Sequence, residues 1–173
     1  MIQEFVNFHK DKTTSAEGRL AAKYKNGAAE VERLQTSLLK HIRPVKSSKG
    51  FVPGFDSGAE QIAEALDGIE KALEVISSDI KAFVELCGEF SMDRLLKDRN
   101  KYRKTLGDAK FATKNATLRE MRAGGAATAA EAESAPRVQE ALAKQDRIEA
   151  EYAPKLAAVE SRIDKAKAIL AKY

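Results

Sequence analysis

Residues 59–90, AEQIAEALDGIEKALEVISSDIKAFVELCGEF, decide the fold of this chain. Apolar side chains recur in this stretch at alternating steps of four and three residues, the spacing that keeps one stripe of a helix against a neighbouring helix. The stretch therefore predicts a long helix packed along its length on other helices. The stripe is called the seam below, and its members are Ile62, Leu66, Ile69, Leu73, Ile76, Ile80, Phe83, Cys87 and Phe90.

The composition supports a helical protein with thin apolar faces. The chain has 173 residues, of which 43% are hydrophobic and 32% charged, and it contains no tryptophan. Much of the apolar content is alanine, which suits long packed helices better than a thick globular core. We therefore expect an all-α protein of one domain. Cys87 is the single cysteine, and its seam position predicts a small buried side chain.

Prolines and glycines divide the chain into three expected long helices. The first covers about residues 3–43 and ends at Pro44, because proline cannot donate the next backbone hydrogen bond. A loop at 44–58 follows, with Asp56 or Ser57 expected to cap the second helix, at about 59–122. A turn at 123–128 leads to the third helix, at about 129–173, in which Pro154 predicts a bend. These helices predict an elongated, antiparallel, coiled-coil-like bundle of three long, kinked helices, completed by dimerisation.

The regular spacing slips once, after Phe90. The next seam position would be Arg94, but the apolar residue Leu95 follows it instead. A slip of one residue turns the stripe by about 100°. We expect a continuous helix with a kink near 91–95. The alternative is a break, with a new helix that uses Ser91 as its N-cap and has Asp93 in its first turn.

The N-terminus carries a short apolar segment. Its spacing is close to helical, and it precedes Lys10 and Lys12. Such a segment can wedge into a lipid headgroup layer. It can equally be the first turn of a helix that packs on its neighbour. The residues concerned are Ile2, Phe5, Val6 and Phe8.

Charge is distributed unevenly along the second expected helix. Residues 55–92 hold nine acids and two bases, a net charge of −7, whereas residues 93–122 hold ten bases and four acids, a net charge of +6. A concentrated basic segment attracts polyanions such as an anionic membrane surface. The same bases can instead pair with acids of a neighbouring helix. The candidate surface residues are Lys97, Arg99, Lys101, Arg103, Lys104, Lys110, Lys114, Arg119 and Arg122.

Catalytic and cofactor chemistry finds no support in the sequence. His9 and His41 have no Cys/His or Glu-x-x-His spacing around them, so we expect no metal site and no cofactor. No glycine-rich phosphate loop is present, and we expect no enzyme. Nucleic acid is an unlikely partner, because no helix-turn-helix is present and the aromatic residues lie on apolar faces and not among the bases. No apolar run is long enough to cross a bilayer, and residues 1–10, MIQEFVNFHK, lack the apolar core and cleavage site of a signal peptide, so we expect a cytoplasmic or peripheral membrane protein.

The order of these features resembles the BAR superfamily, whose domains are curved helical dimers that bind curved membranes. The similarity lies in a first helix that opens with aromatic residues, in the seam, and in residues 80–116, IKAFVELCGEFSMDRLLKDRNKYRKTLGDAKFATKNA. That stretch passes from an apolar run into a basic arm, and residues 146–170 are compatible with a returning arm. The resemblance covers about two thirds of the chain. It implies an antiparallel homodimer whose bases from Lys97 to Lys114 meet anionic phospholipid headgroups.

Two functions from different classes follow. The first is binding and sensing or shaping of curved anionic membranes by a helical homodimer without catalytic activity. The alternative is a helical scaffold or adaptor that binds the helices of another protein through its seam.

Overall fold

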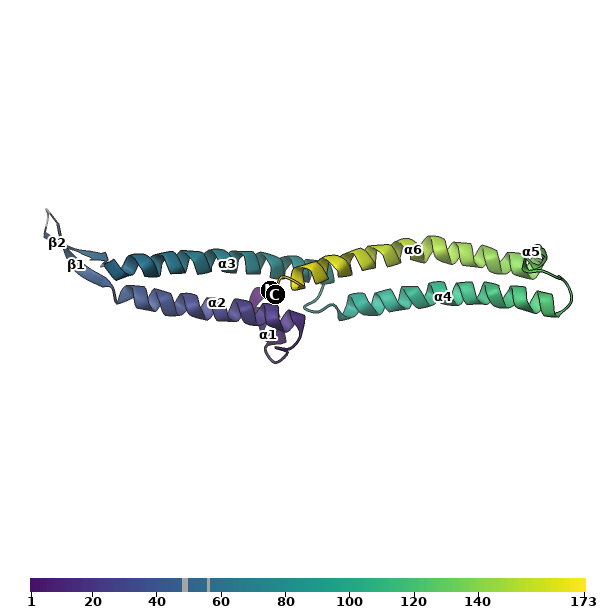
Figure 1. Ribbon diagram of the computed structural model, residues 1–173, viewed down its shortest axis with the longest axis horizontal. Coiled ribbons are helices and arrows are strands. Elements are labelled where there is room, and N and C mark those ends of the chain that lie inside the picture. The colour runs from purple at the N-terminus through teal and green to yellow at the C-terminus, as the bar shows by residue number, and fades with distance from the viewer. Residues whose placement is uncertain (48–49, 56) are drawn as a thin grey trace. The chain divides into compact units, whose positions relative to one another are not determined.

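The structure of the protein, a computed structural model, describes residues 1–47, 50–55 and 57–173, and the side chains of these residues except 43–47, 51–53, 55 and 57. Two compact units make up the chain: unit 1 comprises residues 1–90 and 166–173, and unit 2 comprises residues 91–165. The described residues form six helices and one two-stranded sheet, so the all-α class is confirmed apart from a hairpin (Figure 1). In chain order the elements are α1 (Ile2–His9), α2 (Ala16–Leu39), β1 (Ile42–Ser47), β2 (Gly50–Phe55), α3 (Ser57–Cys87), α4 (Asp93–Arg122), α5 (Ala129–Ala132) and α6 (Pro136–Leu170).

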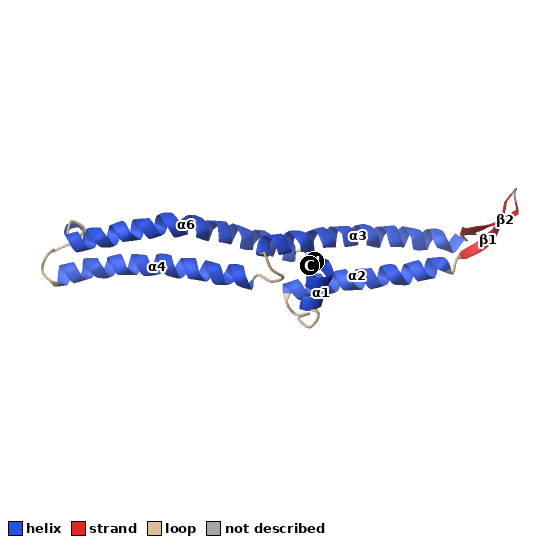
Figure 2. Ribbon diagram, turned by 180° about the vertical axis from the view of Figure 1, so that it is seen from behind, coloured by secondary structure: helices blue, strands red, loops and turns tan. Residues whose placement is uncertain are grey.

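A β-hairpin connects α2 to α3, where we expected the end of a helix and a loop (Figure 2). Strands β1 and β2 are antiparallel, and Pro44 lies opposite Pro53 in their register. An antiparallel ladder alternates hydrogen-bonded and non-hydrogen-bonded pairs. Two facing prolines fit a non-hydrogen-bonded pair, in which neither residue has to donate its backbone N–H. The first expected helix is therefore shorter than predicted. The expected cap at Asp56 or Ser57 lies outside the described residues and side chains.

In unit 1, α2 and α3 lie side by side and α1 packs against both (Figure 1). A Cβ atom added at Gly27 of α2 would lie 2.7 Å from Cδ2 of Leu73, which shows how closely the seam of α3 approaches α2. Four seam residues, Ile76, Ile80, Phe83 and Cys87, are buried. The other five are partly buried, so the seam is the packed face of α3.

Aromatic rings hold α1 against the end of α3. The ring centroids of Phe5 and Phe83 are 5.9 Å apart, and those of Phe5 and Phe90 are 6.4 Å apart. Nε2 of the buried His9 donates a hydrogen bond of 2.6 Å to the carbonyl oxygen of Phe90. Separate helices α1 and α2 thus replace the single first helix that we expected. Ser15 begins α2 as its N-cap, with Oγ accepting from the amide of Gly18.

The expected continuous helix across residues 91–95 is wrong. Helix α3 ends at Cys87, and Gly88 has a φ of 69°, the left-handed conformation that commonly follows the last residue of a helix. The amide of Gly88 donates to the carbonyl of Val84 at 2.7 Å, which completes this helix end. Helix α4 starts at Asp93, whose amide lies 3.4 Å from Oγ of Ser91. The break that we considered as the alternative is observed, with Asp93 in the first turn of α4, but the N-cap is Met92 and not the expected Ser91.

The last residues of the chain bond to α3 within unit 1. Nζ of Lys172 donates to Oδ1 of Asp79 at 2.8 Å, and the hydroxyl of Tyr173 donates to Oδ2 at 2.7 Å. Burial alone would raise the pKa of Asp79, but these two hydrogen bonds outweigh it, so this pKa is lowered. Burial, the hydrogen bond to Asp79 and its charge raise the pKa of Tyr173 to about 12. This cluster is a charge-assisted link in which Asp79 is buried and Lys172 remains exposed.

In unit 2, α4 and α6 lie side by side (Figure 1). The third long helix begins later than the expected residue 129, because a one-turn helix, α5, precedes it and α6 starts at Pro136. Thr128 and Glu131 form a reciprocal capping box at α5, and proline is well suited to the first turn of α6. Pro154 lies inside α6 without ending it.

Candidate anionic-surface binding site

Helix α4 has a buried face and an opposite, exposed face. Leu95, Ala109 and Ala116 are its buried residues. Because an α-helix advances about 100° per residue, positions 97, 104, 111, 115, 118 and 122 fall on the far side from these three, and positions 101, 108 and 119 lie on the adjoining flank. Together these nine positions carry five bases. We call them the basic stripe: Lys97, Lys101, Lys104, Asp108, Phe111, Asn115, Leu118, Arg119 and Arg122.

Five of the nine bases selected from the sequence belong to the basic stripe. They are exposed, and none forms an ion pair within the part of the chain that the structure describes. Asp108 is the single acid of the basic stripe, so the five bases and this one acid give the stripe a net charge of +4. Lys114 is also exposed, on the flank of the stripe. The five bases are Lys97, Lys101, Lys104, Arg119 and Arg122.

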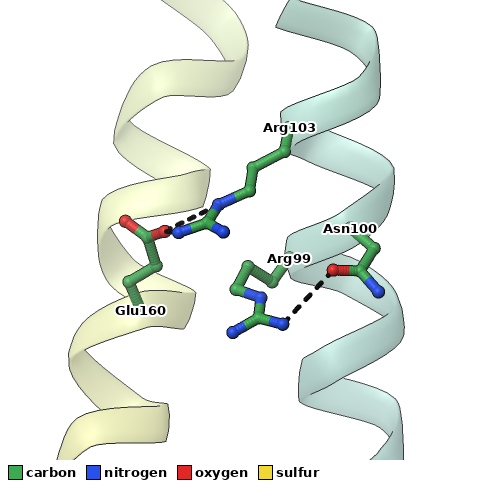
Figure 3. A network of polar contacts seen from close by, with 4 residues as sticks. All are labelled: Arg99, Asn100, Arg103 and Glu160. Atoms are coloured by element: carbon green, nitrogen blue, oxygen red, sulfur yellow. Dashed lines mark hydrogen bonds and ion pairs between the residues drawn. The ribbon is translucent and has the colours of Figure 1, made fainter.

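Three other selected bases are involved in packing α4 against α6 or lie close to it. Nε and Nη2 of Arg103 both donate to Oε1 of Glu160 on α6, Nε at 3.0 Å (Figure 3). Nζ of Lys110 lies 3.5 Å from Oε1 of Glu149, also on α6. Arg99 is partly buried, and its Nη2 donates to the side-chain oxygen of Asn100 at 3.4 Å. Pairing with a neighbouring helix, the alternative explanation of the basic segment, therefore applies to Arg103 and Lys110.

Phe111 and Leu118 were missed by the sequence reasoning. Phe111 is 64% exposed and Leu118 39% exposed, and both lie on the basic stripe. The expectation that aromatic residues stay apart from the bases is therefore wrong for Phe111. Its position seven residues from Lys104 and from Leu118, on the face opposite Ala109, was the signal available in the sequence.

The expected N-terminal wedge residues are divided between the core and the surface. Phe5 and Val6 are buried in unit 1, whereas Phe8 is 47% exposed and Ile2 is partly exposed. Nζ of Lys12 lies 4.4 Å from the centroid of the Phe8 ring. The segment is thus a packed helix, as in the second of the two interpretations above, and Phe8 is its main exposed apolar side chain.

A groove runs beside the basic stripe, between α4 and α6 of unit 2. Its volume is about 580 Å³, and alanines from both helices line it. Small side chains allow the backbone of another helix to approach closely. Charged side chains from both helices lie along the groove: Asp108, Arg119, Arg137, Glu140 and Lys144.

No helix in the described part of the chain is long and apolar enough to cross a membrane. Within residues 1–47, 50–55 and 57–173, no group of three or more His, Cys, Asp or Glu side chains is arranged to hold a metal ion. A scan against protein-family models, a search of curated proteins and a search of solved structures each found no match to this chain.

Proposed function

We propose that the protein is a non-catalytic, peripheral binding module of the cytoplasmic face of a membrane, and that the basic stripe of α4 contacts anionic phospholipid headgroups. The observation that carries this proposal is the segregation of the bases. Arg103 and Lys110 pair with Glu160 and Glu149 of α6, whereas the five bases of the basic stripe remain exposed and without ion pairs among the described residues, including Arg119 at the edge of the groove.

The weak binding expected of a single basic stripe favours a dimer. Each base near an anionic membrane contributes about 1 kcal/mol, so a net charge of +4 supplies about 4 kcal/mol, which corresponds to a dissociation constant of about 1 mM. Two copies that bind one membrane together gain effective concentration. We propose a homodimer for this reason, with curvature sensing or shaping as a property of the pair. The small, alanine-rich contact between α4 and α6 supports this proposal, because two helices alone bury little apolar surface.

Vesicle co-sedimentation tests the proposal. The wild-type chain should bind vesicles of phosphatidylcholine with 30% phosphatidylserine and should not bind phosphatidylcholine alone. The variant Lys97→Glu/Lys101→Glu/Lys104→Glu should bind at least tenfold more weakly. A control with the same charge change, Lys23→Glu and Lys25→Glu in α2 with Lys40→Glu at its C-cap, should bind within twofold of the wild type. Light scattering on the same samples should give twice the 18.9 kDa of one chain.

Three results would contradict the proposal. Binding that ignores phosphatidylserine would exclude recognition of anionic headgroups. An equal loss in both triple variants would show attraction by general charge and not by the stripe. Tighter binding to a short nucleic acid duplex than to the anionic vesicles, lost in the stripe variant, would assign the stripe to nucleic acid.

A helical adaptor is the second candidate, and the groove between α4 and α6 favours it. The seam is covered by α2, as the close approach of Gly27 to Leu73 illustrates, so a partner helix would bind in the groove. Co-purification of a partner that the substitution Ala112→Arg releases, with vesicle binding unchanged, would support this candidate. Ala112 lines the groove and is exposed.

A further inference from the structure

Two large apolar side chains lie within the basic stripe without a role in the fold. Phe111 and Leu118 are seven residues apart on α4, so they occupy the same face two turns from one another. No aromatic or cation-π contact of Phe111 is present in the described residues. A single exposed apolar residue is ordinary on a protein surface, but a pair on one face among bases needs a reason.

The surroundings of Phe111 leave its ring open to solvent. The ring of Phe111 is 64% exposed. One turn earlier, nothing lies within 4 Å of the place where a Cβ atom of Gly107 would be, so this side of α4 is open there. An exposed ring of this kind can enter an adjacent phase.

Bases surround the two apolar residues at the distances expected for an interfacial helix. Lys104 precedes Phe111 by seven residues and Lys114 follows it by three, while Arg119 and Arg122 flank Leu118. A helix that lies in the membrane interface places its apolar residues at the boundary of headgroups and acyl chains, and its long bases reach the phosphates. The phosphate backbone of a nucleic acid duplex would meet the bases but offers no layer of acyl chains for the two apolar residues.

We propose, on the premise that the basic stripe binds anionic membranes, that Phe111 and Leu118 insert into the boundary between headgroups and acyl chains. The insertion supplies a part of binding that salt does not screen, because salt weakens interactions between exposed charges and not apolar burial. It also makes binding tighter on small vesicles, whose strongly curved outer leaflet exposes more of the acyl boundary.

A tryptophan reporter tests insertion directly, because the chain contains no tryptophan. In the Phe111→Trp variant, emission should shift to shorter wavelength when vesicles with 30% phosphatidylserine are added, and lipids brominated in the acyl chain should quench it. Val75, on α3, is 59% exposed and lies outside the stripe, so Val75→Trp serves as the matched control and should show neither effect. Equal responses in the two variants, or none in Phe111→Trp while it sediments with vesicles, would overturn the inference.

Salt dependence separates this inference from the proposed function. The variant Phe111→Ser/Leu118→Ser should bind at least tenfold more weakly than the wild type at both 50 mM and 500 mM salt, with the same slope of affinity against salt, because the lost apolar burial is not screened. It should also lose the preference for vesicles of 30 nm over those of 400 nm. Val75→Ser should match the wild type throughout. Superimposable salt curves for the wild type and the double variant would overturn the insertion alone, whereas absence of wild-type binding at 50 mM would overturn the proposed function itself.

Discussion

Units 1 and 2 are both built on pairs of long helices, but their interiors differ. Unit 1 buries Phe5, Leu20, Ile80 and Phe83 completely, at 0% exposure each. The buried residues of α4 in unit 2 are Leu95 and two alanines, and ion pairs such as that between Arg103 and Glu160 link its helices. Unit 2 also buries the aliphatic side chains of Val138 and Ile163, at 0% and 2% exposure, but among the described residues aromatic rings are fully buried only in unit 1.

Because of this difference, the two units should contribute differently to the stability of the fold and to the proposed binding surface. Burying a large apolar side chain contributes about 1.5–3 kcal/mol, whereas an exposed ion pair contributes at most about 1 kcal/mol. Most of the free energy of folding should therefore come from unit 1. Unit 2 gains less from burial, and the exposed face of its helix α4 carries the net charge of +4 that the proposed function uses.

Replacing Phe83 should give the largest effect. The substitution Phe83→Ala removes a fully buried ring that contacts Phe5 and should lower the free energy of unfolding by about 3–5 kcal/mol. The control Phe111→Ala, at an exposed position of unit 2, should change it by less than about 0.5 kcal/mol. Urea denaturation followed by circular dichroism measures both. A loss below about 1 kcal/mol for Phe83→Ala would contradict the contrast between the two interiors.

Glycine replacement should give an effect of opposite sign in the two units. A Cβ atom at Gly18 would lie 1.8 Å from the carbonyl oxygen of Lys12, which accepts bonds from the amide and hydroxyl of Ser15. Gly18→Ala should therefore destabilise the turn before α2 by about 1–3 kcal/mol.

The matched control is Gly107→Ala in α4, where nothing lies within 4 Å of the added atom. Alanine favours a helix interior over glycine, so this variant should gain about 0.5–1 kcal/mol. Thermal denaturation of the two variants side by side gives the comparison. A stabilising shift in both variants would show that the close approach at Gly18 is relieved without cost.

The smallest effect concerns pH. The pKa of Tyr173 is raised in the fold from 10.0 to about 12, so its stabilising contribution is complete below pH 10 and is lost as the pH rises from about 10 to 12. The pKa of Asp79 is lowered from 3.8, so its contribution is present above that pH and is lost at lower pH. Tyr173→Phe should cost about 1 kcal/mol at pH 7 and should flatten the decline between pH 10 and 12.

Tyr102→Phe is the control for this substitution. The ring of Tyr102 packs 5.7 Å from that of Tyr152 in unit 2, away from Asp79. Denaturation at pH 7 and at about pH 11 should leave this control close to the wild type. If Tyr173→Phe keeps the full alkaline decline of the wild type, the bond to Asp79 is not its source.

Local patterns predicted most of the helical structure. Alternating apolar steps located the seam, since a stripe on one helix depends only on residues three and four apart. The slip after Phe90 was visible too, but a slip of one residue has the same pattern for a kink and for a break. Gly88 distinguishes the two, because only a break needs its left-handed backbone.

Features that join distant residues were beyond the sequence. Pairing of β1 with β2 depends on the register of two strands, and their prolines indicated a loop. The division of the bases into paired and exposed ones depends on how α4 lies against α6, which brings Arg103 to Glu160 over 57 positions of sequence. The sequence identified the bases of α4, but which of them pair with α6 and which remain exposed is known only from the structure.

The non-helical residues between Cys87 and Asp93 affect how the chain tolerates insertions and deletions. In a continuous helix each inserted residue would turn everything beyond it by about 100°. Here α3 ends at Cys87, Gly88 follows it with a left-handed backbone, and α4 begins anew, so the hydrogen-bond ladders of the two helices are independent. A gain or loss of one residue in this connection leaves the seam on the packed face of α3 and the basic stripe on the exposed face of α4.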